Sequence, residues 1–121
     1  MKELKFRAII PERNAIIYFT LNDLLQDKFS NRVILWKWLE EGNQPDLFIG
    51  IKDKNNREIY EGDIVRYDDK YTAVVEWKDR CFHFKFIDGM RHVSSKTYPV
   101  IEVVGNVYGN PELILDVYDE T

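Results

Sequence analysis

Cysteine is almost absent from this chain of 121 residues, which contains only Cys81. An intramolecular disulfide is therefore impossible, and such cysteine usage is typical of proteins that work in a reducing compartment. Cys81 stands among aromatic residues in WKDRCFHFKF, which predicts a buried, unreactive thiol. The first residues lack the features of a secretion signal, and no apolar run approaches the length of a membrane span. We therefore expect a cytoplasmic protein.

Motifs that carry catalysis are also missing. The sequence contains no GxxxxGK[ST] phosphate loop, no GxGxxG, no HExxH and no GxSxG. Histidine occurs only twice, and we expect His83 and His92 to face solvent on the polar side of a hairpin. Two histidines are too few for a closed zinc site, which needs about four ligands. The sequence therefore predicts no enzymatic activity, no metal and no cofactor.

A sustained basic face is absent as well. The net charge is −4, and basic and acidic blocks alternate along the chain. Because nucleic-acid binding requires neutralisation of phosphates, this balance argues against a nucleic-acid partner. Residues 70–100 carry a local basic excess, which keeps a single-stranded nucleic-acid-binding barrel open as the alternative. Its surface would combine these residues: Lys78, Arg80, Lys85, Arg91 and Lys96, with Tyr71 or Tyr98 for base stacking.

The N-terminal part of the chain has a β-strand pattern followed by a helical pattern. KELKFRAII alternates apolar and polar residues, and AIIYF is rich in β-branched and aromatic residues, so the two segments predict a β-hairpin. TLNDLLQDKF then offers Thr20 as a helix N-cap with Asp23 three residues later, a variant of the capping box. A short helix of about two turns is expected after the hairpin.

Residues 30–41 admit two interpretations. RVILWKWLEEG places apolar residues at helical spacing and has Gly42 as a stop, whereas its Val, Ile and two Trp favour a strand. We favour the helix. Trp38 then belongs to the apolar face and Trp36 does not. Both are candidate interface residues, because an exposed Trp is a typical hot-spot residue; internal packing of Trp36 is the competing interpretation.

From residue 47 onward the pattern is β almost throughout. DLFIGIKD and REIY predict a hairpin, and the charges select its loop. A three-residue loop, 54–56, sets Asp53 against Arg57, whereas a two-residue loop would oppose like charges. Loops of this length usually need one residue in the left-handed conformation, and Asn56 occupies that position.

Glu61-Gly62-Asp63 interrupts the next apolar run. Gly62 can adopt a backbone conformation that other residues resist, and Asp63 can accept hydrogen bonds from nearby amides. The spaced oxygen ligands of a calcium loop are absent, and no nucleophile or base lies near. We therefore interpret this segment as a corner of a small β-barrel rather than as a catalytic or metal loop.

Asp88-Gly89 is a strong hairpin signal. If these two residues form the loop, Phe86 pairs with Arg91 and Phe84 pairs with Val93. Pro99 would then end the returning strand.

Three stretches together resemble the YopX family of bacteriophage and prophage proteins. They are KFRA near the N-terminus, IGIKDKNNREIYEGDIVR in the centre, and IEVVGNVYGNPELI near the end. The family usually has Gly where this chain has Asn56, and both residues suit a left-handed turn position.

The resemblance implies a mainly β fold with a small SH3-like barrel over residues 47–121. Residues 1–46 would form a β-hairpin and one or two short helices, packed on or extending the barrel as one structural unit. The resemblance brings no catalytic or binding residues. We therefore expect an accessory protein of the host cytoplasm that binds another protein, from host or phage, or a second copy of itself.

Overall fold

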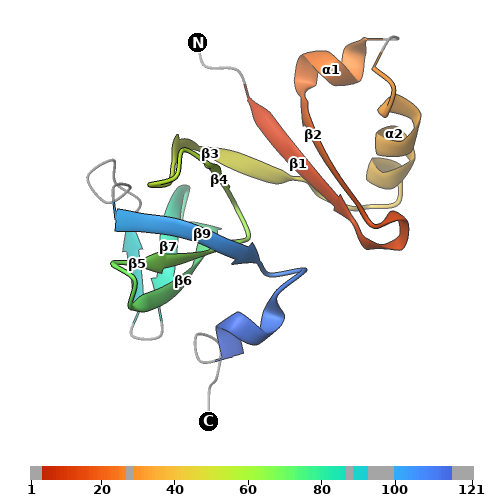
Figure 1. Cartoon of the computed structure of the whole chain (residues 1–121). Coiled ribbons are helices and arrows are strands. Elements are labelled where there is room, and N and C mark those ends of the chain that lie inside the picture. The colour runs from red at the N-terminus through yellow and green to blue at the C-terminus, as the bar shows by residue number, and fades with distance from the viewer. Residues whose placement is uncertain (1–3, 27–28, 87–88, 93–99, 116–121) are drawn as a thin grey trace. The chain divides into compact units, whose positions relative to one another are not determined.

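The computed structural model describes residues 4–26, 29–86, 89–92 and 100–115, with only the backbone described for residues 90–92. The chain divides into two units, Met1–Phe48 and Ile49–Thr121. Strands dominate both units, and two short α-helices follow the first hairpin (Figure 1). The prediction of a mainly β fold is thus confirmed. None of the described helices is long and apolar enough to cross a membrane.

Unit 1 begins with a β-hairpin. Strands β1 (Lys5–Ile10) and β2 (Ala15–Thr20) are antiparallel, with Ile10 opposite Ala15 and Lys5 opposite Thr20. A 3₁₀ turn, η1 (Pro11–Arg13), connects them and ends at Asn14, whose φ of 50° is left-handed. Asn tolerates this conformation better than most residues, which explains its position at the end of the turn.

Two helices follow, α1 (Leu21–Leu25) and α2 (Arg32–Glu40). Thr20 and Asp23 form the predicted capping box: the Thr20 hydroxyl accepts the Asp23 amide at 3.1 Å, and the Asp23 carboxylate accepts the Thr20 amide at 2.9 Å. The helical interpretation of residues 30–41 is confirmed, because Arg32–Glu40 is α-helical.

The core of unit 1 lies between the hairpin and the helices. Alternate residues of β1 and β2 point to one face, where the apolar side chains of α1 and α2 cover them. The buried residues are Ala8, Ile10, Ile17, Phe19, Leu24, Leu35 and Trp38.

Strand β3 (Asp46–Lys52) begins in unit 1, where Asp46 pairs with Arg7 of β1. The two side chains form a buried ion pair: Arg7 Nε and Nη2 lie 3.0 and 2.9 Å from Asp46 Oδ2. The sequence places Arg7 on the polar side of its strand and Asp46 at the start of the next predicted strand, and neither assignment predicts burial. Tertiary packing therefore decides the environment of both residues.

Unit 2 contains most of the strands. In chain order they are β4 (Glu58–Tyr60), β5 (Asp63–Tyr67), β6 (Tyr71–Lys78), β7 (Cys81–Phe86), β8 (Gly89–His92) and β9 (Ile101–Asn106). A 3₁₀ turn, η3 (Pro111–Ile114), follows the last strand. Strands β5 to β9 form one antiparallel sheet in the order β8-β7-β6-β5-β9, while β4 pairs with β3 (Figure 1).

The predicted barrel is not closed in the part of the chain that the structure describes, because β8 and β9 are the two edges of this sheet. The β3–β4 hairpin approaches β9 through its turn and not as a further strand of the ladder. The Lys54 amide donates to the Ile101 carbonyl at 2.8 Å, and the Val103 amide donates to the Asp53 carboxylate at 2.9 Å.

Both faces of this sheet are apolar. The larger cluster contains Ile59, Val65, Ala73, Val75, Phe84, Ile101 and Val103. On the other face, η3 contributes Ile114 to a smaller cluster with Ile64 and Val74. A sheet covered on both sides can bury even polar side chains of its central strands.

The predicted register of the β7–β8 hairpin is wrong by two residues. Gly89 starts β8 and pairs with Phe86, and Arg91 pairs with Phe84. A shift of two residues leaves every side chain on its original face, so hydrophobic alternation could not distinguish the two registers. Gly89, the first residue of β8, has a φ of 135°, a backbone conformation that glycine adopts more readily than other residues. Asp88, the other predicted turn residue, lies outside the described residues.

Gly105 in β9 gives a prediction about stability. A Cβ atom at this position would lie 2.4 Å from Asn110 Oδ1 and 3.0 Å from Asn110 Cβ. Asn110 Oδ1 accepts the Asn106 amide, so the side chain is not free to move away. We expect Gly105→Ala to lower the free energy of unfolding by roughly 1–3 kcal/mol, measured by urea denaturation. Gly109→Ala is the matched control, because a Cβ atom added at Gly109 would lie no closer than 3.6 Å to its nearest neighbour, Asn106 Oδ1. Equal losses of unfolding free energy in the two variants would contradict the prediction.

Candidate functional site

The two tryptophans of α2 occupy different environments. Trp38 is buried in the core of unit 1 with 8% of its surface exposed, whereas Trp36 is 40% exposed. Both positions agree with the helical spacing. The indole N–H of Trp36 donates to the Leu24 carbonyl at 3.4 Å, so one edge of the ring is anchored to α1. Trp38 therefore packs internally, and Trp36 remains the candidate interface residue.

Other exposed apolar side chains stand on the same two helices as Trp36. Arg32 Nε donates to the same Leu24 carbonyl at 2.9 Å, and these two bonds hold α2 against the end of α1. Residues 21 and 25 share one face of α1, and residues 33 and 36 share one face of α2. We define the α1–α2 patch as Leu21, Leu25, Val33 and Trp36, with exposed fractions of 52, 72, 79 and 40%.

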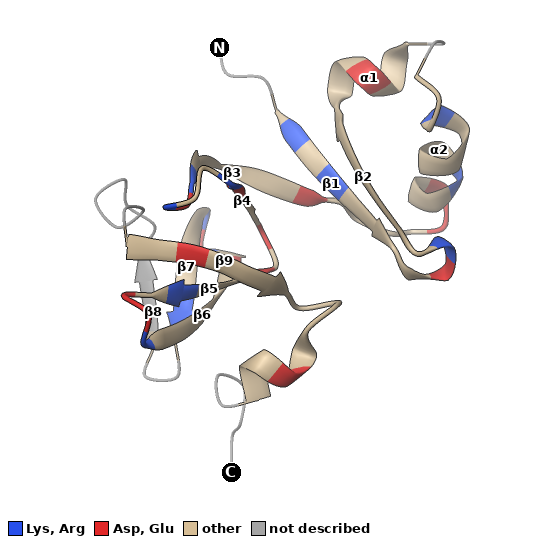
Figure 2. Ribbon diagram, viewed as in Figure 1, with Lys and Arg blue, Asp and Glu red and all other residues tan. Residues whose placement is uncertain are grey.

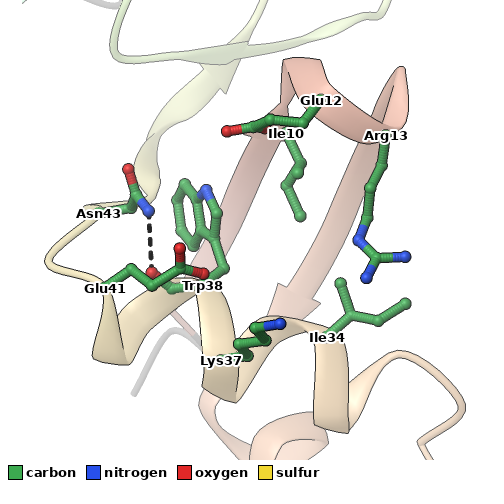
Figure 3. Close-up of a pocket in the computed structure, with 8 residues that line it drawn as sticks. All are labelled: Ile10, Glu12, Arg13, Ile34, Lys37, Trp38, Glu41 and Asn43. Atoms are coloured by element: carbon green, nitrogen blue, oxygen red, sulfur yellow. Dashed lines mark hydrogen bonds between the residues drawn. The ribbon is translucent and has the colours of Figure 1, made fainter.

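A cavity of about 150 Å³ lies in unit 1 between η1 and α2. Its apolar residues are Ile10, Ile34 and Trp38, and Asn43 closes one side by donating to the Trp38 carbonyl at 3.0 Å (Figure 3). We call this cavity the η1–α2 pocket. Because its apolar residues belong to the core and its opening faces solvent, a ligand could enter without unfolding the unit.

The rim of the η1–α2 pocket carries four exposed charged residues: Glu12, Arg13, Lys37 and Glu41. Figure 3 shows the carboxylates of Glu12 and Glu41 toward Trp38, and the cationic groups of Arg13 and Lys37 toward Ile34. Opposite charges are thus separated across the pocket. Sequence reasoning missed this site, because its residues come from two segments that only the fold brings together.

The Gly62-Asp63 segment is a corner between β4 and β5. Asp63 is only 1% exposed, and its carboxylate accepts the Tyr60 amide at 2.8 Å. Gly62 has a φ of 86°; its amide donates to the Val75 carbonyl, and its carbonyl accepts the Val107 amide. Hydrogen bonds therefore fix this corner to β6 and to the end of β9, which is a structural role for both residues.

Asn56 has a φ of 66°, the left-handed conformation expected at the end of a loop spanning residues 54–56. Asp53 and Arg57 flank the loop, and the Asp53 amide donates to the Arg57 carbonyl at 2.8 Å. On the same loop, Lys54 Nζ lies 3.2 Å from Asp69 Oδ1, and this hydrogen bond raises the pKa of Lys54 above its ordinary value.

His83 corrects another prediction. It is 7% exposed and not solvent-facing, and its strand β7 lies inside the sheet between β6 and β8. His83 pairs with His92 of β8, and its Nε2 lies 3.8 Å from the sulfur of the half-buried Cys81. The His92 side chain lies outside the described residues. Within those residues, no group of three or more His, Cys, Asp or Glu is arranged to hold a metal ion.

The residues of the alternative nucleic-acid surface are only partly described. Lys78, Arg80 and Tyr71 are exposed, and Lys85 is half-buried. The side chains of Arg91, Lys96 and Tyr98 lie outside the described residues. Basic and acidic residues are interspersed along the strands of unit 2 (Figure 2), and nucleic-acid binding stays a prediction.

Comparison with family models finds a match over residues 5–115 to the family described as YopX protein. No curated protein matches this chain. The matched region covers most of both units, including the corner at Gly62 and the candidate residues of α2.

Proposed function

We propose that this chain, which belongs to the YopX family, is a non-catalytic accessory protein that binds another protein through the α1–α2 patch. The partner presents an apolar surface to this patch. It is either a different protein or a second copy of this chain. The family resemblance leads us to place this activity in the cytoplasm of a phage host. The absence of known catalytic motifs and the single cysteine support binding in a reducing compartment.

The observation that carries the proposal is that two helices joined at the Leu24 carbonyl expose the four large apolar side chains of the α1–α2 patch. Isolated apolar residues are normal on a protein surface, but groups of them mark interaction sites. Val33 and Leu25 are 79 and 72% exposed, so burial by a partner would remove considerable apolar area from water. Trp36 is held in place by its bond to Leu24, which lowers the entropy lost on binding.

We expect Trp36→Ala to weaken association by roughly 30-fold, the effect of removing a hot-spot side chain worth about 2 kcal/mol. Sedimentation of the full chain over a range of concentrations measures self-association. If the wild type is monomeric, affinity capture from infected host cells tests for a different partner protein.

Trp77→Ala is the matched control, because Trp77 in unit 2 is 52% exposed and lies outside the α1–α2 patch. Its association should equal that of the wild type. Association that persists in Trp36→Ala, or that is lost equally in both variants, would contradict the assignment to this patch. If the wild-type chain does not self-associate and affinity capture also recovers no partner protein, the proposal is refuted.

A further inference from the structure

We propose that the η1–α2 pocket binds a small zwitterion of the ω-amino acid class, in which an aliphatic chain separates an ammonium group from a carboxylate. This site shares no residue with the α1–α2 patch, so the inference goes beyond the function proposed above.

The size of the pocket limits its ligand. A cavity of about 150 Å³ resembles engineered cavities that hold one benzene molecule. It is smaller than the roughly 300–1,000 Å³ of pockets that take drug-sized ligands. Its apolar residues, with Ile10 4% and Trp38 8% exposed, can contact a short hydrocarbon chain.

The ends of the ligand follow from the separated charges of the rim. An ammonium group is favoured beside Glu12 and Glu41, where the aromatic ring of Trp38 adds to the attraction of the two carboxylates (Figure 3). A carboxylate is favoured beside Arg13 and Lys37, because a guanidinium group can bind both carboxylate oxygens.

These four charged side chains are available to a ligand. Among the residues that the structure describes, none of the four forms an ion pair with its neighbours. Lys37 and Glu41 are four residues apart, the spacing of a helical ion pair, yet no ion pair joins them within the described part of the chain. A zwitterion spanning the pocket would satisfy both sides at once.

The first experiment titrates the full-length protein with ε-aminocaproate and follows the indole N–H of Trp38 by NMR. Hexylamine and hexanoate, which each keep one charged end, are the comparison ligands. We expect saturable binding of ε-aminocaproate with a dissociation constant of about 1 mM, the range for a small ligand at an exposed rim. Each comparison ligand should bind roughly tenfold more weakly.

Charge-neutralising variants locate the two ends. We expect Glu12→Gln with Glu41→Gln to weaken ε-aminocaproate binding roughly tenfold, and to leave hexanoate binding unchanged or stronger. Arg13→Gln with Lys37→Gln should also weaken ε-aminocaproate binding roughly tenfold, and it should leave hexylamine binding unchanged or stronger. Glu40→Gln, an exposed change on α2 outside the pocket, should bind as the wild type does. These positions are solvent-exposed, so the variants should fold.

A carboxyl-terminal lysine of a peptide presents the same ammonium and carboxylate as a free ω-amino acid. A peptide ending in lysine and its amidated form therefore distinguish the two sources. Binding of the acid form, but not of the amide, assigns the site to chain ends; binding of ε-aminocaproate alone assigns it to free zwitterions. Absence of saturation with both probes, equal binding of hexylamine, or unchanged binding in both double variants would overturn the proposal.

Discussion

Replacing Asp53 by alanine is expected to lower the free energy of unfolding by at least about 3 kcal/mol. The Asp53 carboxylate is buried, and it accepts three backbone amides. Oδ1 accepts those of Asn55 and Arg57 at 2.8 and 2.9 Å, and Oδ2 accepts that of Val103 at 2.9 Å. The variant would leave these donors without their acceptor. A hydrogen bond to a charged group contributes about 1.5–3 kcal/mol, and the bond to Val103 is buried while the two bonds in the turn are partly buried.

The position of these amides explains why the effect should be large. Asn55 and Arg57 belong to the turn of the β3–β4 hairpin, whereas Val103 lies in β9. One side chain thus shapes the turn and attaches it to the sheet edge. Loss of the carboxylate should destabilise the turn and its attachment to β9 together, which urea denaturation followed by circular dichroism would measure.

Two further variants test this explanation. Asp53→Asn keeps one carbonyl oxygen for the turn amides but directs an NH₂ group at the Val103 N–H, so it should fall between the wild type and Asp53→Ala. Asp69→Ala removes an exposed carboxylate that pairs with Lys54 of this loop, and it should destabilise the protein far less than Asp53→Ala. A loss in Asp53→Ala no greater than in Asp69→Ala would refute the explanation.

Removing one partner of the Arg7–Asp46 ion pair should have an effect of similar size. We expect Asp46→Ala to lower the free energy of unfolding by about 3–5 kcal/mol, because it leaves the Arg7 guanidinium buried without its main counter-charge. The side chains of Arg7 and Asp46 are only 6 and 9% exposed, and water cannot replace the lost carboxylate easily.

The double variant Arg7→Met with Asp46→Leu distinguishes the stabilisation that comes from the ion pair from the cost of burying a single unpaired charge. Removing both charges also removes their desolvation penalty, so this variant should be more stable than Asp46→Ala. Urea denaturation of the wild type, Arg7→Met, Asp46→Leu and the double variant completes a mutant cycle. Simple additivity of the two single changes would show that the pair contributes no coupling energy.

Local sequence determined much of unit 1. Thr20 and Asp23 specify the start of α1 through bonds between neighbours in the chain, which any fold would preserve. Helical spacing in residues 32–40 likewise placed Trp38 in the core and left Trp36 exposed. The charges that flank the loop 54–56 select its length, and that length requires the left-handed conformation that Asn56 adopts. In each case, the deciding interaction spans only a few residues.

Asp53 was understood only in part from the sequence. Its charge correctly indicated a position opposite Arg57, but its three backbone bonds were not foreseen. The preference of Asp for bonding amides two residues further along was a signal that could have revealed the turn contact. Nothing local to Asp53 indicates the bond to Val103, which lies 50 residues away.

The sequence by itself determined which segments become strands or helices, because hydrophobic period, caps and turn residues act over short distances. Tertiary structure alone decided the β7–β8 register, the burial of His83, the Arg7–Asp46 pair and the η1–α2 pocket. Each of these depends on which segments meet across the fold. A pattern of period two or 3.6 assigns a side chain to a face, but it does not say what covers that face or what lies opposite.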